Sequence, residues 1–265
     1  GSEMCIRDRF IYCVSSCRKQ VDKGFEMTVD LSISNPYLPM SVLVDTIESV
    51  RLQLPSPYFW GMVDNVISKD SCYYISDRKQ EMAFRFSKNG TFLNAIGQRG
   101  EGPGEYREMD SFFVGKDCVY VCDMSKRTIY SYSFDGKFLH SLSFPYSLVF
   151  NDVVELPDGR FLCHRPSQSE NCKGLWILDQ KGRRVKNLLE YEKGTPCKNS
   201  YWNTLCAQED GTIKIYNPVD GSYYQYDAVN DTVVRTMRQK SNLPMLADFH
   251  CSDRELYETC LLYTS

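Results

Sequence analysis

The sequence predicts an all-β protein whose strands form four-stranded antiparallel sheets. Aromatic residues make up 13% of its 265 residues, and aromatic side chains pack well on pleated, half-buried strands. Short stretches of alternating apolar and polar residues, the pattern of such strands, recur between turn residues along the chain. These stretches also repeat at a period close to 46 residues. The chain is therefore expected to consist of repeated β-sheet units.

Composition and charge exclude two broad classes of protein. Hydrophobic residues account for 42% of the chain and charged residues for 25%, as in ordinary globular domains. The formal net charge is −3 and no run of Lys or Arg forms a basic stripe, so no nucleic-acid partner is expected. No apolar stretch approaches the roughly 20 residues of a membrane-spanning helix, so membrane contact is expected only through a lipid anchor.

The internal repeat is the strongest signal in the chain. Residues 73–77 align with residues 119–123, and Asn89-Gly90 aligns with Asp135-Gly136, each at an offset of 46. Asn-Gly and Asp-Gly supply the positive-φ residues that tight hairpins require. A third and a fourth copy follow at further offsets of 46 and 48 residues.

Each copy contains four strand-like stretches separated by turns, the pattern of one blade of a β-propeller. The predicted partial propeller covers residues 42–259. Its four blades are expected at about residues 59–97, 110–144, 150–189 and 202–238. A strand-like stretch at residues 42–54, ahead of the first blade, is expected to be a closing strand, which pairs with the last blade and closes the ring.

A family resemblance follows from the segment Ile-Gly-Gln-Arg-Gly-Glu-Gly-Pro-Gly-Glu-Tyr at residues 96–106. Together with residues 119–123 and 134–138, it resembles an NHL-type repeat. More closely, residues 42–250 resemble the six-bladed β-propeller lipoproteins of Gram-negative envelopes, a largely uncharacterised family. The resemblance implies that four blades and a closing strand remain from a six-bladed ring truncated at both ends. It also implies a location in the cell envelope, as an outer-membrane lipoprotein facing the periplasm or the surface.

The two ends of the chain are set aside from the propeller. Residues 1–9 and 260–265 resemble translated sequencing-adapter read-through. Residues 10–17 resemble the end of a lipoprotein signal peptide, which would place the lipid on Cys17; the alternative is a chance cysteine in an irregular arm. Polar residues 18–41 are expected to form a tether.

Several side chains are candidates for ligand binding. The Gly-rich loop at residues 97–106 precedes a strand rather than a helix, which argues against a phosphate site. Within it, Arg99, Glu105 and Tyr106 either face a ligand or anchor the linker between blades. Trp60 and Trp202, together with Arg165, could offer stacking and hydrogen-bonding surfaces to a glycan or peptide; alternatively, the Trp residues only seal blade junctions.

A second set of candidates recurs where the first strand of each blade begins: Asp64, Asp110, Asp152 and Asn203. A ring of these oxygen ligands would suit Ca²⁺ or Mg²⁺. The alternative is that each side chain caps nearby backbone N–H groups, as Asp and Asn do in turns. No other cofactor is expected.

Catalytic patterns are scarce. The three histidines lie at non-equivalent positions of the repeats, without metal-ligand spacing, and His164 is expected to be solvated near a strand end. The sequence therefore favours an envelope-anchored binding or scaffold protein that recognises a protein, peptide or glycan, a conclusion drawn from fold analogy. The alternative is a metal-dependent propeller enzyme of the lyase or lactonase kind. No residue is assigned a catalytic role.

Overall fold

The computed structural model describes residues 25–29, 44–165, 174–190, 204–208, 210–218 and 221–241. These residues form seventeen strands. Within the same ranges, no helix is long and apolar enough to span a membrane. The prediction of an all-β protein is confirmed.

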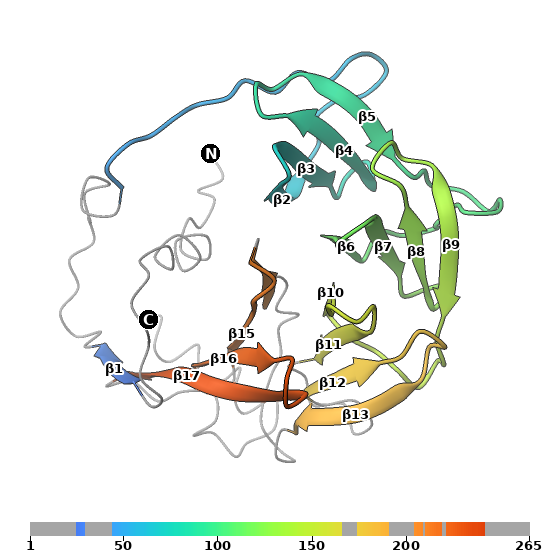
Figure 1. The fold of residues 1–265 in the computed structure, drawn as a ribbon. Helices are drawn as coiled ribbons and strands as arrows, with labels where there is room; N and C mark the ends of the chain where they lie inside the picture. The colour runs from blue at the N-terminus through green and yellow to red at the C-terminus, as the bar shows by residue number, and fades with distance from the viewer. Residues whose placement is uncertain are drawn as a thin grey trace, which may run out of the picture.

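Sixteen of the strands form four antiparallel sheets, in each of which the spatial order of the strands follows the chain. Figure 1 shows the four sheets following one another around a common centre, with β2, β6 and β10 innermost and β5, β9, β13 and β17 outermost. The sheets are therefore four blades of a β-propeller, as predicted. The strands of blade 1 are β2 (Val63–Lys69), β3 (Cys72–Asp77), β4 (Met82–Ser87) and β5 (Phe92–Ile96), and those of blade 2 are β6 (Ser111–Val114), β7 (Val119–Asp123), β8 (Thr128–Tyr132) and β9 (Phe138–Ser143). Blade 3 comprises β10 (Asp152–Glu155), β11 (Phe161–Arg165), β12 (Gly174–Leu178) and β13 (Arg184–Leu189), and blade 4 comprises β14 (Leu205–Ala207), β15 (Ile213–Asn217), β16 (Ser222–Asp227) and β17 (Thr232–Ser241).

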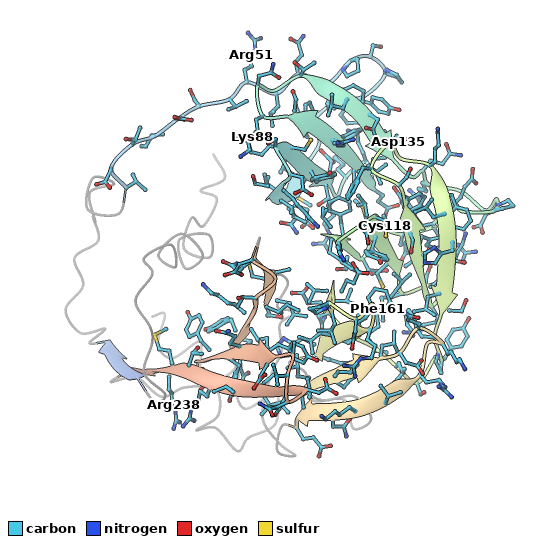
Figure 2. All side chains as sticks on the ribbon, viewed as in Figure 1. Arg51, Lys88, Cys118, Asp135, Phe161 and Arg238 are labelled. Atoms are coloured by element: carbon cyan, nitrogen blue, oxygen red, sulfur yellow. The ribbon has the colours of Figure 1, made fainter. Side chains whose placement is uncertain are left out.

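The core lies between neighbouring blades, because both faces of each sheet carry apolar side chains. Tyr74 of blade 1 packs in one cluster with Phe112 of blade 2, whereas the next residue, Phe113, joins Val153 of blade 3 in another cluster. Successive residues of a strand point to opposite faces, so β6 serves two interfaces. Figure 2 shows side chains filling these spaces, and Cys118 of blade 2 and Phe161 of blade 3 belong to the same cluster.

Hairpin glycines bring the outer rims of neighbouring blades together. Gly136, in the β8–β9 turn, has φ = 82°, and a Cβ there would collide with the carbonyl oxygen of Ala95 in β5. Gly182, in the β12–β13 turn, lies in the same way against the carbonyl oxygen of Ser143 in β9. In these two hairpins, the turn glycine therefore also sets how closely one blade approaches the preceding blade.

An ion-pair cluster joins blades 3 and 4. Arg160 donates hydrogen bonds to both carboxylate oxygens of Asp231, at 3.1 Å and 3.0 Å, and the Tyr226 hydroxyl donates to Asp231 Oδ1 at 2.5 Å. Lys186 Nζ lies 3.3 Å from Asp231 Oδ2. Chiefly because of Arg160, the pKa of Asp231 falls to about 2. This cluster draws the β10–β11 hairpin towards the β16–β17 turn.

Two of the predicted segments differ from the structure. Residues 44–54, within the predicted closing strand at 42–54, form no strand; instead, Leu52 and Leu54 pack on the flank of blade 1. No described strand pairs with them, and a strand needs a paired neighbour to satisfy its backbone hydrogen bonds. The predicted tether at 18–41 contains β1 (Phe25–Val29), which pairs in parallel with residues 237–241 of β17.

The cysteines in the strands are small apolar residues of the core. Cys72, Cys118, Cys122 and Cys163 are buried, Cys206 is half-buried, and all five are free thiols. Free cysteine behaves as a small hydrophobe in such positions.

We expect Gly136→Ala to destabilise the protein more than Gly211→Ala does. Both glycines have φ = 82°, a conformation that costs an L-residue about 1–2 kcal/mol. Only Gly136 also faces a carbonyl oxygen; nothing lies within 4 Å of a Cβ at Gly211. The clash should add about 1–3 kcal/mol, measurable from urea unfolding midpoints. Equal losses in the two variants would contradict the packing role of Gly136.

Candidate functional site

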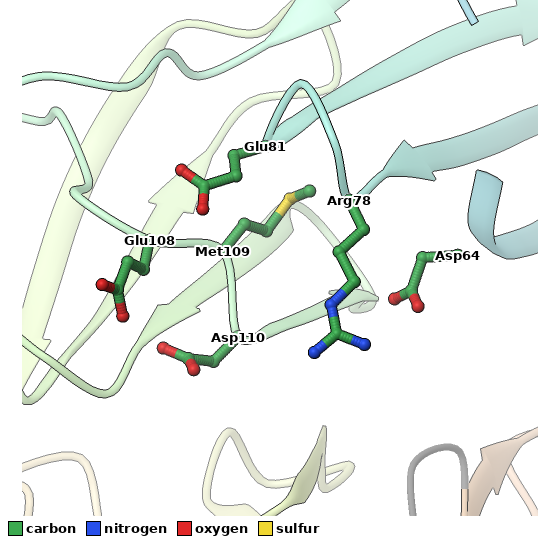
Figure 3. Close-up of a pocket in the computed structure, with 6 residues that line it drawn as sticks. All are labelled: Asp64, Arg78, Glu81, Glu108, Met109 and Asp110. Atoms are coloured by element: carbon green, nitrogen blue, oxygen red, sulfur yellow. The ribbon is translucent and has the colours of Figure 1, made fainter. Parts of the chain in front are cut away.

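A polar recess of about 160 Å³ opens between blades 1 and 2. Figure 3 shows acidic side chains around it, with Arg78 between Asp64 and Asp110. The six lining residues are Asp64, Arg78, Glu81, Glu108, Met109 and Asp110. Two of the four residues predicted at the strand starts, Asp64 and Asp110, therefore lie at one site.

Three segments supply these side chains. Arg78 and Glu81 lie in the turn between β3 and β4, and residues 108–110 form the linker that enters β6. Asp64 lies in an irregularity of β2, since Val63 pairs with Asp77 and Asn65 with Ser76. Such bulges re-aim a side chain, and Asp64 is exposed towards the recess.

Asp64 and Asp110 occupy equivalent repeat positions but differ in their hydrogen bonds. Asp110 Oδ2 accepts the backbone N–H of Met124 at 2.7 Å. In blade 1 the equivalent N–H, that of Arg78, donates instead to the carbonyl oxygen of Met62 at 2.8 Å. The capping alternative therefore fits Asp110, whereas the carboxylate of Asp64 is not used for this cap.

The recess carries an excess of negative charge, because four carboxylates surround one guanidinium. Burial raises the pKa of Asp110, and the charges of Glu108 and Asp123 raise it further, whereas the Met124 N–H and Arg78 oppose the shift. Clustered carboxylates of this kind attract a cationic group.

The Gly-rich linker is tied to the same turn. Arg99 Nε lies 3.2 Å from Glu81 Oε2, with 63% of the Arg99 side chain exposed. The buried Tyr106 donates its hydroxyl hydrogen to the backbone oxygen of Glu81 at 2.8 Å. Its ring packs against Tyr130 and Tyr132. Tyr106 therefore anchors the linker, while Arg99 lies at the edge of the recess.

Glu105 is engaged within its own loop. Its Oε2 accepts the N–H of Gly102 at 2.8 Å, and its Oε1 accepts a hydrogen bond from the Gln98 amide. The hydrogen bond from Gly102 lowers the pKa of Glu105 most, and the bond from Gln98 lowers it further. The arrangement fits the linker-anchor alternative for Glu105.

Sequence reasoning missed the residue that positions the recess linker. Asp123 Oδ2 accepts the N–H groups of Arg107 (2.7 Å) and Glu108 (3.3 Å). Its Oδ1 accepts from Ser125 Oγ at 2.7 Å and from Lys126 N–H at 2.8 Å. Asp77 holds the entry to blade 1 in the same way, through the N–H groups of residues 61, 62, 79 and 80. The available signal was the Asp shared by the first two repeats at an offset of 46.

Asp152 lies at the junction of blades 3 and 4, away from the recess. Its Oδ2 accepts the N–H of Leu205 at 2.8 Å and a hydrogen bond from Thr204 Oγ1 at 3.3 Å. The same Thr204 Oγ1 lies 2.6 Å from His164 Nδ1. His164 is fully buried, so the prediction of a solvated His164 is wrong: its position in β11 faces the next blade rather than solvent.

The remaining candidates do not join the recess. Trp60 stacks on Phe86 and meets Phe84 edge-on, which fits the sealing alternative, although 36% of Trp60 remains exposed. Arg165, at the end of β11, donates to the carbonyl oxygen of Val149 at 3.4 Å. Cys17, Trp202 and Asn203 lie outside the described residues.

The sequence profile of the family described as "Domain of unknown function (DUF4934)" matches residues 26–258. The chain belongs to this family. No curated protein matches this DUF4934 chain.

Solved structures resemble it in fold. A Bacteroides fragilis protein, named as a predicted exported protein, has a TM-score of 0.63 and 22% identity, over 75% of this chain and 57% of its own. A Bacteroides caccae protein of unknown function has a TM-score of 0.39 and 13% identity, over 69% of this chain and 61% of its own. Virginiamycin B lyase from Staphylococcus aureus has a TM-score of 0.43 and 11% identity, over 66% of this chain and 55% of its own. The DUF4934 chain thus spans less than two thirds of each of these structures.

The described members of the predicted metal ring do not form one site in the DUF4934 chain. Among the residues described, no three His, Cys, Asp or Glu side chains are grouped so that they could hold a metal ion. Asp152 accepts hydrogen bonds from blade 4, Asp110 caps Met124, and Arg78 places a positive charge between Asp64 and Asp110. Asp152 therefore lies apart from Asp64 and Asp110, and a divalent cation held by these side chains and Asn203 stays a prediction.

We expect Asp152→Asn and His164→Gln to change the pH dependence of stability in opposite directions. Burial raises the pKa of Asp152 to about 6, against hydrogen bonds from Leu205, Val153 and Thr204 that lower it, so between pH 6 and 4 only the folded state holds this proton. Burial lowers the pKa of His164 to about 3, so over the same range only the unfolded state protonates it. As the pH falls, Asp152 therefore stabilises the fold and His164 destabilises it, each by at most about 1.4 kcal/mol per pH unit.

The measurement is the urea unfolding midpoint of both variants and the parent chain between pH 7 and pH 4. Relative to the parent, His164→Gln should gain stability as the pH falls, whereas Asp152→Asn should lose it. Parallel curves for all three proteins would contradict the assignment.

We expect Asp123→Ala to destabilise the protein by about 2–4 kcal/mol, because buried N–H groups lose a charged acceptor. Burial opposes the ionisation of Asp123, but the hydrogen bonds from Ser125 and from three backbone N–H groups outweigh it and lower the pKa. The stabilisation that the ionised carboxylate of Asp123 gives the folded state is fully present at pH values well above its usual pKa of 3.8. It is lost as the pH falls below that value, through the lowered pKa of the folded state. The control is Asp135→Ala, which removes only an exposed contact of 3.7 Å with Lys137. Similar unfolding midpoints for the two variants would refute the role of Asp123.

Proposed function

We propose that the chain is an exported β-propeller, anchored in the cell envelope, that binds a protein or peptide partner through the recess between blades 1 and 2. One observation carries the proposal: side chains from three separate segments, four of them carboxylates, converge on a cavity of about 160 Å³. A rigid scaffold that presents polar groups from loops in this way is typical of a binding site.

The chemistry of the recess favours a basic side chain of the partner. Its carboxylates complement an ammonium or guanidinium group, and Met109 adds an apolar surface that suits the aliphatic stem of Lys or Arg. The volume is that of a single side chain rather than a folded ligand. A neutral glycan would leave these carboxylates without a charged partner, so a protein or peptide is the better match.

Two observations support location in the envelope. Residues 10–17 have the pattern of a lipoprotein signal ending at Cys17, and the similar Bacteroides fragilis protein is named as a predicted exported protein. A lipid on Cys17 would hold the propeller at the membrane and leave the recess free for a partner.

The proposal predicts binding of a Gly-Ser peptide with one central Lys, detected by shifts of the backbone amide signals at residues 64, 78 and 108–110. Glu108→Gln and Asp64→Asn should each weaken it about fivefold, since one carboxylate–cation contact is worth about 1 kcal/mol. Arg78→Gln should strengthen binding, because it removes the competing cation. Raising the salt concentration should weaken all of these complexes.

The matched control is Asp135→Asn, which alters an exposed carboxylate on the outer rim of blade 2. It should bind like the parent chain. Equal binding of a peptide with a central Glu, or no response at the recess amides, would reject the proposal.

A further inference from the structure

A second set of side chains lies one interface along from the recess, where blade 2 meets blade 3. Arg127 ends the turn between β7 and β8 and occupies the repeat position of Glu81, 46 residues earlier. Both residues have positive φ angles, 53° for Arg127 and 52° for Glu81. The same place in the repeat therefore carries a carboxylate at the recess and a guanidinium at the next interface.

The linker between blades 2 and 3 is fastened to Arg127. The N–H of Phe144 donates to the backbone oxygen of Arg127 at 2.9 Å, and Nη1 of Arg127 donates to the backbone oxygen of Leu148 at 3.1 Å. The side chains of Phe144, Leu148 and Phe150 are buried in the cluster between the two blades. Backbone bonds and apolar packing together therefore hold this linker in one position.

Tyr146 lies in the turn of this linker, which a hydrogen bond of 3.0 Å from the Leu148 N–H to the backbone oxygen of Pro145 closes. The Tyr146 side chain is 76% exposed, and the guanidinium carbon of Arg127 lies 5.3 Å from the centre of its ring, a cation–π contact. In the preceding linker, by contrast, Tyr106 is 0% exposed. One linker thus buries its tyrosine as an anchor, whereas the next presents it on the surface.

The guanidinium of Arg127 has donors that the protein does not use. An arginine side chain carries five N–H donors, and the bond to Leu148 takes one of them. The Nε atom is buried without an acceptor, and no carboxylate forms an ion pair with Arg127 among the residues described. A second cation, Arg165, is tied to the same linker through the backbone oxygen of Val149 at 3.4 Å. Cationic side chains in this arrangement favour a carboxylate, which accepts paired N–H bonds from a guanidinium.

The recess and the Arg127 site belong to one continuous surface. Asp110, which lines the recess, accepts the N–H of Met124 at 2.7 Å, and Met124 lies in the same turn as Arg127. Each site combines the turn after the second strand of one blade with the linker into the next blade, so the repeat places both on the same face of the ring. A peptide bound at the recess can therefore continue along this face to Arg127.

We propose that Arg127 and Tyr146 form a second subsite for the partner of the recess, one that receives an Asp or Glu side chain. The proposal rests on the proposed function, because a basic side chain of the same peptide occupies the recess. The carboxylate accepts hydrogen bonds from the guanidinium of Arg127, and the ring of Tyr146 packs beside it. The partner is thus a peptide with one basic and one acidic residue, matched to opposite charges at neighbouring interfaces.

The test uses Gly-Ser peptides that contain one Lys, one Glu, or both residues in either order at spacings of about three to eight residues. The Glu peptide should shift the backbone amide signals of residues 127 and 146–148 and leave those of residues 64, 78 and 108–110 unchanged. At the best spacing, the peptide with both residues should bind about fivefold more tightly than the Lys peptide, as expected for one added carboxylate–guanidinium contact.

Variants assign this gain to the subsite. Arg127→Gln should bind the Lys peptide and the Lys–Glu peptide equally and should lose the response to the Glu peptide. Tyr146→Ser should reduce the gain, and its exposed position makes it the variant to use if Arg127→Gln does not fold. The matched control is Arg235→Gln, which alters an exposed arginine in β17 of blade 4 and should keep the full gain.

Two outcomes would overturn the proposal. One is that the amides of residues 127 and 146–148 do not respond to the Glu peptide. The other is that the parent chain binds the Lys peptide and the Lys–Glu peptide equally at every spacing. Failure of the proposed function gives a different result, because the recess amides would then not respond to the Lys peptide.

Discussion

The fold depends on one packing requirement: each sheet must bury both of its faces, and between the blades the neighbouring sheet covers them. Two neighbouring residues of β6 show this directly: Phe112 packs in the cluster shared with blade 1, and Phe113 packs in the cluster shared with blade 3. Where the requirement is met, side chains such as Trp176 and Tyr74 are almost fully buried. Where no sheet follows, irregular chain and partly exposed apolar side chains take its place. The stability of each blade is therefore shared with its neighbours rather than contained in it.

This arrangement also explains where the charged side chains lie. The flanks are apolar and the hairpins at the rim bring backbones into contact, so charged side chains gather in the turns and linkers between blades. Asp77 and Asp123 use such positions to fix the entry to a blade, and Asp231 uses one to join two blades. The recess combines a turn of one blade with the linker into the next. Its geometry is consequently set by an interface and not by any single blade.

Period and alternation were enough to predict the four blades, because local turn signals and the two-residue strand period decide where each strand begins and ends. The same reasoning failed for residues 44–54 and for β1, since a lone strand-like segment takes its conformation from the partner it finds. Asp64 and Asp110 could be singled out from their repeat positions. Arg78, Glu81 and Glu108 could not, because turn residues converge only when two blades pack. Asp152 shared the repeat position but lies buried at another junction, where Thr204 and His164 give it a structural environment.

The pairing of β1 with β17 has a mechanical consequence. A pull applied to the chain ahead of Phe25 would load the short parallel ladder between residues 25–29 and 237–241 before it reached the segment that leads into blade 1. The backbone hydrogen bonds of that ladder would bear the load first, and they lie on the outer rim, beyond the packed interfaces. Under tension, the hydrogen bonds of this ladder would therefore break first, while the blades and the recess between the first two blades kept their shape.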